Sequence, residues 1–113
     1  MTPNLSLPLI AAAQAQKHVT SNESTIGLDA LAQASAIDKD LSTPPGAPSD
    51  GDTYIVGSSP TGAWAGNADA IAYFYNGEWY LYPAKDGWVC FVQDEAKFYA
   101  YNSGAWVLLS TLL

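Results

Sequence analysis

The fold is decided by residues 71–82, which read IAYFYNGEWYLY. Aromatic and β-branched side chains favour strands on both sides of Asn76-Gly77. Both turn residues tolerate a positive φ, so this dipeptide predicts a type I′ turn between two antiparallel strands. Because side chains alternate between the faces of a strand, rings fall on both faces of this hairpin. The sheet is therefore either covered on both sides or exposes one ring-rich face.

A second hairpin with the same plan is expected further along the chain. Residues 97–101 and 106–109 flank Asn102-Ser103-Gly104, so an aromatic residue, Asn, Gly and Trp recur in the same order. Two more strands are expected at 53–56 and 88–92, next to Gly-containing turns. These segments predict an antiparallel β-meander of about six strands with Trp-bearing hairpins.

The chain before Ser42 has a different composition, because every Trp, Tyr and Phe follows that residue. Pro3 and Pro8 favour an extended opening, and residues 11–16 have the composition of a short helical turn. Thr20 with a Glu three positions later fits a capping box, which predicts a helix over about residues 21–34.

We therefore expect an α+β fold in a single domain spanning residues 1–113. A helical N-terminal segment, residues 1–42, would pack on an aromatic-rich antiparallel region, residues 43–113. The prolines of the TPPGAP stretch at residues 43–48 mark the boundary, because they cannot continue a helix. Neither part is long enough to bury a full core alone.

Charge and cysteine content disfavour several classes of function. Eleven Asp and Glu stand against four Lys, without Arg, and give a net charge of −7. Binding to nucleic acid or to an anionic membrane surface needs basic side chains and is disfavoured. The N-terminus lacks the basic region of a signal peptide, and the chain lacks an apolar run long enough to insert into a membrane. Cys90, the single cysteine, allows neither an internal disulfide nor a cysteine metal site, and no cofactor motif occurs.

The residues do not suggest an enzyme or a metal site. His18 is the single histidine, and no nucleophile elbow is found. The carboxylate pairs Asp94-Glu95 and Asp50-Gly51-Asp52 lie where turns are expected, and Asp is favoured there for turn hydrogen bonds. Asp38-Lys39-Asp40 and Asp50-Gly51-Asp52 offer oxygen ligands of the kind calcium prefers, but neither continues into an EF-hand loop.

The tryptophans suggest a second kind of site. Indole rings stack on sugars when they are exposed on a sheet. The candidate glycan-stacking residues are Trp64, Trp79, Trp88 and Trp106. Core packing or a subunit interface explains the same rings, and that explanation is the more common one.

The segment LPLIAAAQAQKHVTSNE at residues 7–23 resembles a family of domains of unknown function. The similarity continues through residues 28–31, 44–45, 51–57, 61–66 and 87–88. Members of that family are found in tailed phages, prophages and gene transfer agents of Alphaproteobacteria, typically at the N-termini of tail-fibre and head-spike proteins. The resemblance implies a place at the surface or tail of a particle, and no catalytic residue.

The polar start of the predicted helix is the candidate docking or oligomer interface. Its side chains are dense in hydrogen-bond donors and acceptors; they are Gln14, Gln16, Lys17, His18, Asn22 and Glu23. An ordinary solvated helix start is the alternative explanation.

The sequence and the resemblance together predict a structural or attachment module of a phage or gene-transfer-agent particle, made in the host cytoplasm. Its expected partners are other virion proteins and further copies of itself, with a trimer favoured. A carbohydrate-binding module that recognises host polysaccharide is the alternative. The C-terminal leucines, Leu108, Leu109, Leu112 and Leu113, need burial, for which we favour a neighbouring chain.

Overall fold

The hairpin of residues 71–82 forms as predicted, with strand β3 (Ile71–Tyr75) paired antiparallel to strand β4 (Glu78–Tyr82). Asn76 and Gly77 have φ values of 50° and 84°, as a type I′ turn requires. These features belong to a computed structural model, which describes residues 1–9 and 16–113, and the side chains of residues 1–9 and 22–113. Strand β2 (Thr53–Ile55) pairs antiparallel with β3 and completes a three-stranded sheet.

The second hairpin belongs to a separate, four-stranded sheet. Its order is β1-β5-β6-β7, with β1 (Ser35–Ala36), β5 (Val89–Val92), β6 (Lys97–Asn102) and β7 (Ala105–Leu108). The pairs β5–β6 and β6–β7 are antiparallel, as the meander prediction requires. The α+β class is confirmed. Strand β1 was not predicted, and it pairs parallel to β5.

The chain segment that follows α1 connects the two sheets. Ser35 and Ala36 pair with Phe91 and Val92 in the four-stranded sheet. The next residues turn to the other sheet: Ile37 donates its backbone N–H to the Thr53 carbonyl at 2.7 Å, and Ile55 donates to the Asp38 carbonyl at 3.1 Å. The four residues 35–38 therefore form hydrogen bonds with backbone groups at the edges of both sheets.

Helix α1 (Gln16–Leu31) begins earlier and ends earlier than the predicted 21–34. The capping-box prediction is wrong, because Thr20 lies inside the helix instead of at its start. The short helical turn predicted at residues 11–16 lies outside the described residues except for Gln16. Two 3₁₀ turns are also present, η2 (Gly62–Trp64) and η3 (Leu109–Leu112).

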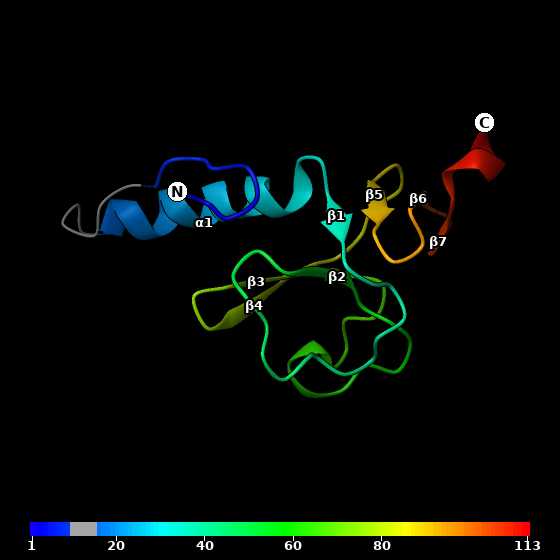
Figure 1. Cartoon of the computed structure of the whole chain (residues 1–113), viewed down its shortest axis with the longest axis horizontal. Coiled ribbons are helices and arrows are strands. Elements are labelled where there is room, and N and C mark those ends of the chain that lie inside the picture. Colours follow the sequence, from blue (N-terminus) through cyan, green and yellow to red (C-terminus); the bar gives the residue numbers. More distant parts are fainter. Residues whose placement is uncertain (10–15) are drawn as a thin grey trace.

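Both faces of the three-stranded sheet are covered, which resolves the alternative left open by the sequence. Tyr73 packs with Ile26 and Ala30 of α1 on one face. Trp64 packs with Ala72 and Tyr54 on the other face. In Figure 1 the helix runs above β2, β3 and β4, and the segment that carries η2 lies below them. A further core between the two sheets contains Ile55, Ile71, Cys90, Val92 and Tyr99.

Candidate functional site

Five of the six predicted docking residues lie in the described part of α1. Gln14 is outside the described residues, and Gln16, Lys17 and His18 form the first helical turn, with side chains that are not described. Figure 1 shows this first part of α1 reaching past the tip of the β3–β4 hairpin. The structure therefore places the backbone of these residues away from both sheets.

Asn22 and Glu23 are the docking residues whose side chains are described. Asn22 is half-buried, and Glu23 is exposed. Glu23 lies near strand β4: burial raises the pKa of the Tyr80 and Tyr82 hydroxyls, and the charge of Glu23 adds to both increases. Glu23 therefore borders the sheet, whereas the first turn of the helix projects beyond it.

The first residues of the chain are fastened to α1 through Asp29, which is 2% exposed. Its carboxylate accepts hydrogen bonds from the backbone N–H of Asn4 at 3.0 Å and of Leu5 at 2.5 Å. The Tyr73 hydroxyl donates to the same carboxylate at 2.7 Å. Thr2 also donates to it, and the Thr2 hydroxyl oxygen accepts from the Leu7 N–H at 2.8 Å. We call residues 2–7 together with Asp29 the N-terminal clasp.

Hydrogen bonding determines the charge of the clasp. Burial by itself raises the pKa of Asp29, but the four hydrogen bonds to its carboxylate outweigh burial and hold that pKa below its usual value. Conversely, burial and the neighbouring carboxylate raise the pKa of Tyr73. Asp29 is therefore ionised and Tyr73 neutral at pH 7, which makes their hydrogen bond charge-assisted.

The clasp also contacts the turn before β2. The Asn4 side-chain amide donates to the Gly51 carbonyl at 3.2 Å. A Cβ on Gly51 would lie 2.6 Å from the Asn4 Oδ1 and 2.8 Å from the Pro3 Cβ, so only glycine fits this approach. A largely polar hollow of about 460 Å³ opens beside the contact, with Asp29, Gln33 and Gln93 in its lining.

The carboxylates of this turn have structural roles, as expected from the sequence. Asp50 accepts the Asn76 N–H at 2.9 Å, which ties the turn to the β3–β4 hairpin. Asp52 accepts the Ser49 N–H at 2.9 Å within its own turn. Both carboxylates therefore hold backbone groups that a loop would otherwise leave to water.

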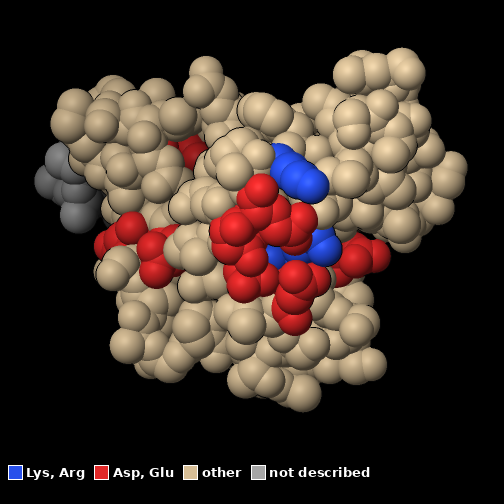
Figure 2. Space-filling view, turned by 45° about the vertical axis from the view of Figure 1, so that its right-hand side comes forward, with Lys and Arg blue, Asp and Glu red and all other residues tan. Residues whose placement is uncertain are grey.

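An acidic cluster forms where the two sheets meet. Asp38, Asp40 and Asp94 each place a carboxylate oxygen within 4.8 Å of the others. Asp38 accepts the Asp40 N–H at 2.7 Å, which fixes the turn that carries two of the three groups. Figure 2 shows acidic side chains gathered in the middle of one face around lysines. Oxygen ligands at this spacing are of the kind that calcium prefers.

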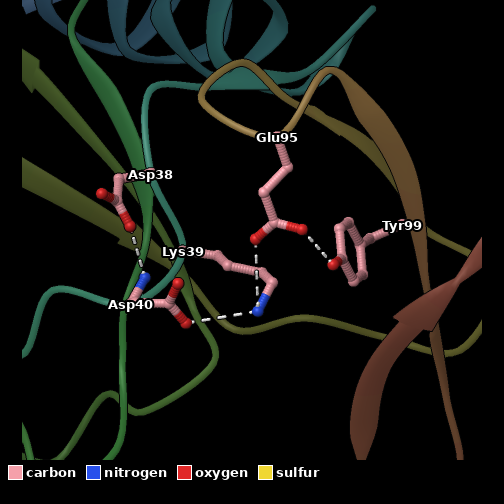
Figure 3. Close-up of polar contacts among 5 residues, drawn as sticks. All are labelled: Asp38, Lys39, Asp40, Glu95 and Tyr99. Atoms are coloured by element: carbon pink, nitrogen blue, oxygen red, sulfur yellow. Dashed lines mark hydrogen bonds and ion pairs between the residues drawn. The ribbon is translucent and has the colours of Figure 1, made fainter.

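Lys39 supplies a positive charge inside this cluster. Its ammonium lies 3.2 Å from Asp40 Oδ1 and 3.6 Å from Glu95 Oε2, and Glu95 accepts a hydrogen bond from the Tyr99 hydroxyl (Figure 3). Partial burial works to lower the pKa of Lys39, but the hydrogen bond and charges of its partners raise it. Desolvation and the charges of Asp38, Glu95 and Asp40 raise the pKa of Asp94. The cluster therefore carries its own counter-ion.

One of the four predicted stacking residues cannot serve that purpose. Trp64 is 0% exposed, and its ring lies 5.2 Å from that of Trp79 and 5.6 Å from that of Tyr54, so the prediction of an open stacking face is wrong for Trp64. Trp79, Trp88 and Trp106 are half-buried. Trp106 donates its indole N–H to the Asp69 carbonyl at 2.8 Å. The indoles thus contribute to the scaffold, and sugar stacking on the other three stays a prediction.

Comparison with known proteins identifies the family. The family model described as protein of unknown function DUF2793 matches residues 21–107. The chain belongs to this family. Among curated proteins, none matches the chain. Within the described residues, no helix combines the length and the apolar character needed to cross a membrane.

Sequence reasoning missed both residue groups that connect distant segments. The sequence offered Asp38 and Asp40 in one turn and Asp94 in another, and only the β1–β5 pairing brings the two turns together. Asp29 was not singled out. A carboxylate on the helix face that packs against the sheet, one position before buried Ala30, was the available signal, since a buried charge needs partners.

Proposed function

We propose that this chain is a structural or attachment module of a phage or gene-transfer-agent particle, of fibre, spike or decoration type. It acts without catalysis, is made in the host cytoplasm, and docks to other virion proteins through its N-terminal segment. The proposal rests first on family membership and on the resemblance over residues 7–23. The structural observation that supports it is the position of the first turn of α1, which projects past the sheets (Figure 1).

The N-terminal clasp gives this projection a mechanical role. Three hydrogen bonds to Asp29, from the Thr2 hydroxyl and from the backbone N–H groups of Asn4 and Leu5, hold residues 2–7 against the helix. A fourth, from the Tyr73 hydroxyl, holds Asp29 against the sheet. A load applied to the N-terminal segment is therefore passed to β3, in the centre of the three-stranded sheet, and not to the helix alone. An attachment module needs this kind of connection between its docking segment and its body.

Particle incorporation tests the proposal. The variant Gln16→Ala, His18→Ala, Asn22→Ala removes polar groups from the docking segment, and we expect it to be depleted from purified particles. A control variant, Lys85→Ala with Asn102→Ala, changes two exposed positions at or near the four-stranded sheet, and it should be incorporated normally. Quantitative mass spectrometry of particles, beside the amount of soluble protein in the cells, gives the readout. Equal incorporation of both variants contradicts docking through α1.

The carbohydrate-binding alternative now depends on three tryptophans. Trp79, Trp88 and Trp106 are half-buried and keep some contact with solvent, whereas Trp64 is 0% exposed. Sugar stacking on these rings would change their fluorescence. Titration with host surface polysaccharides, with Trp88→Phe and Trp106→Phe variants as controls, tests this function. Unchanged fluorescence across the panel excludes it for the sugars used.

A further inference from the structure

The four-stranded sheet has one face in the core and an opposite, apolar face that is open at Val89 and Phe98 and closed at Ala100, which is 4% exposed. Cys90, Val92 and Tyr99 point into the core between the sheets. Alternation along the strands places the neighbouring residues on the opposite side, where the register pairs Phe91 with Phe98, and Ala100 with both Val89 and Val107. We call these five residues, Val89, Phe91, Phe98, Ala100 and Val107, the outer face.

Phe98 is the most prominent side chain of the outer face. It is 53% exposed, and its ring meets that of Phe91 edge-on at 5.0 Å. It also borders two shallow hollows. One, of about 500 Å³, is shared with Val89 and Phe91, and the other, of about 400 Å³, is shared with Leu108 and Leu109. Phe98 therefore forms a ridge between two hollows of the same molecule.

Charge separates this surface from the rest of the chain. The protein has eleven acidic residues and a net charge of −7, yet all five residues of the outer face are uncharged. Lys97 is the one ionisable residue among those that line the two hollows. The acidic residues gather elsewhere, and the upper right lobe in Figure 2, on the side where Figure 1 places the C-terminus, shows no charged residue on the face in view.

We propose that the outer face binds the outer face of a second copy of this chain. Two copies with a net charge of −7 repel each other wherever their acidic surfaces approach, so a face without acidic side chains is where they can meet. A Phe ridge beside hollows on the same surface is self-complementary, as an interface between identical chains requires. The proposed function names other virion proteins as partners, and this inference goes beyond it to a second copy of the chain. A face that binds itself relates two copies by a two-fold axis, so it gives a dimer and not the trimer favoured from the sequence.

The test measures the mass of the full purified chain. Sedimentation equilibrium over a range of concentrations should show association, and added NaCl should strengthen it because salt screens the repulsion between acidic copies. Phe98→Glu places a charge on the ridge and should weaken association by about 30-fold or more, the effect of losing a central contact. Leu28→Glu is the matched control, since Leu28 is 58% exposed on α1 and lies outside the outer face.

Each outcome decides the proposal. Association of the natural chain and of Leu28→Glu, with loss in Phe98→Glu, supports it. A natural chain that stays monomeric at every concentration overturns the proposal. The finding that a different protein covers the outer face overturns it as well. Equal association of the two Glu variants also overturns it. Circular dichroism establishes that each variant is folded, and Phe98→Ser replaces Phe98→Glu if the latter does not fold.

The particle experiment remains independent of this one. The triple alanine variant of α1 should associate in solution as the natural chain does, because its changes lie outside the outer face. Failure of self-association in solution would leave the incorporation result unaffected.

Discussion

The Tyr73 hydroxyl donates a hydrogen bond of 2.7 Å to Asp29, which lies 44 positions earlier in the chain. Both side chains are buried, so this contact joins the centre of the three-stranded sheet to α1 away from water. The same carboxylate accepts two backbone N–H groups of the N-terminal residues. One ionised side chain thus connects three parts of the structure.

Removing the Tyr73 hydroxyl should destabilise the protein. Tyr73→Phe keeps the ring but loses a hydrogen bond to a charged group, which contributes about 1.5–3 kcal/mol. We expect the free energy of unfolding, measured by urea denaturation, to fall by an amount in this range. Tyr75→Phe is the control, because Tyr75 is a half-buried neighbour whose ring lies 6.4 Å from that of Tyr73. Equal decreases in the free energy of unfolding of the two variants would show that the hydrogen bond from Tyr73 to Asp29 adds no stability beyond that of an ordinary tyrosine hydroxyl.

The stability of the natural chain should decrease in acid partly through Asp29. Its pKa is lowered in the folded protein because the hydrogen bonds to its carboxylate outweigh burial. A lowered pKa stabilises the fold above the unfolded value, about 3.9, and this contribution is lost as the pH falls through the folded pKa. Urea denaturation between pH 7 and pH 2 should show a smaller acid-dependent loss for Asp29→Asn than for the natural chain. Identical pH dependence would contradict this assignment.

The sequence predicted the hairpins because their signals are local. Asn76-Gly77 and Ser103-Gly104 all adopt the positive φ values that a tight turn demands, and the aromatic residues beside them form the strands. The turn roles of Asp50 and Asp52 were predicted for the same reason, since a short side chain bonds to nearby backbone.

Features that depend on distant segments could not be predicted in this way. Strand β1 has two residues, and only its pairing with β5 makes it a strand. That pairing brings the turn of Asp38 and Asp40 beside Asp94, so the acidic cluster follows from topology and not from spacing. The helix start was misplaced because Thr20 and its Glu partner match a capping box equally well inside a longer helix.

The turn that carries Asp38 and Asp40 should be sensitive to a single methyl group. A Cβ on buried Gly57 would lie 2.8 Å from the Leu41 carbonyl oxygen and 3.0 Å from that of Asp40, so the backbone would have to move. Gly57→Ala should therefore lower the free energy of unfolding by about 1–3 kcal/mol, the usual cost of overpacking. At Gly46 no described atom lies within 4 Å of an added Cβ, and Gly46→Ala should change stability by less than about 0.5 kcal/mol. If the Gly57→Ala protein is as stable as the Gly46→Ala control, the backbone of the turn that carries Asp38 and Asp40 can shift to make room for the added methyl group at no cost in stability.

The thiol of Cys90 should be protected in the folded protein. Cys90 is 0% exposed, its Sγ lies 3.6 Å from the Phe91 carbonyl oxygen, and burial raises its pKa to about 11. The thiolate is the reactive form, and a rise from the ordinary 9.0 to about 11 lowers its population at pH 8 by about 100-fold, before access is considered.

A disulfide reagent such as DTNB should therefore react slowly with the natural chain at pH 8 and rapidly in denaturant. The double variant Cys90→Ala, Ser110→Cys supplies an exposed thiol as the reference for full reactivity. Since Cys90 packs in the core between the two sheets, its rate reports how often that core opens. A natural chain that reacts as fast as the exposed reference would show that the two sheets separate readily in solution.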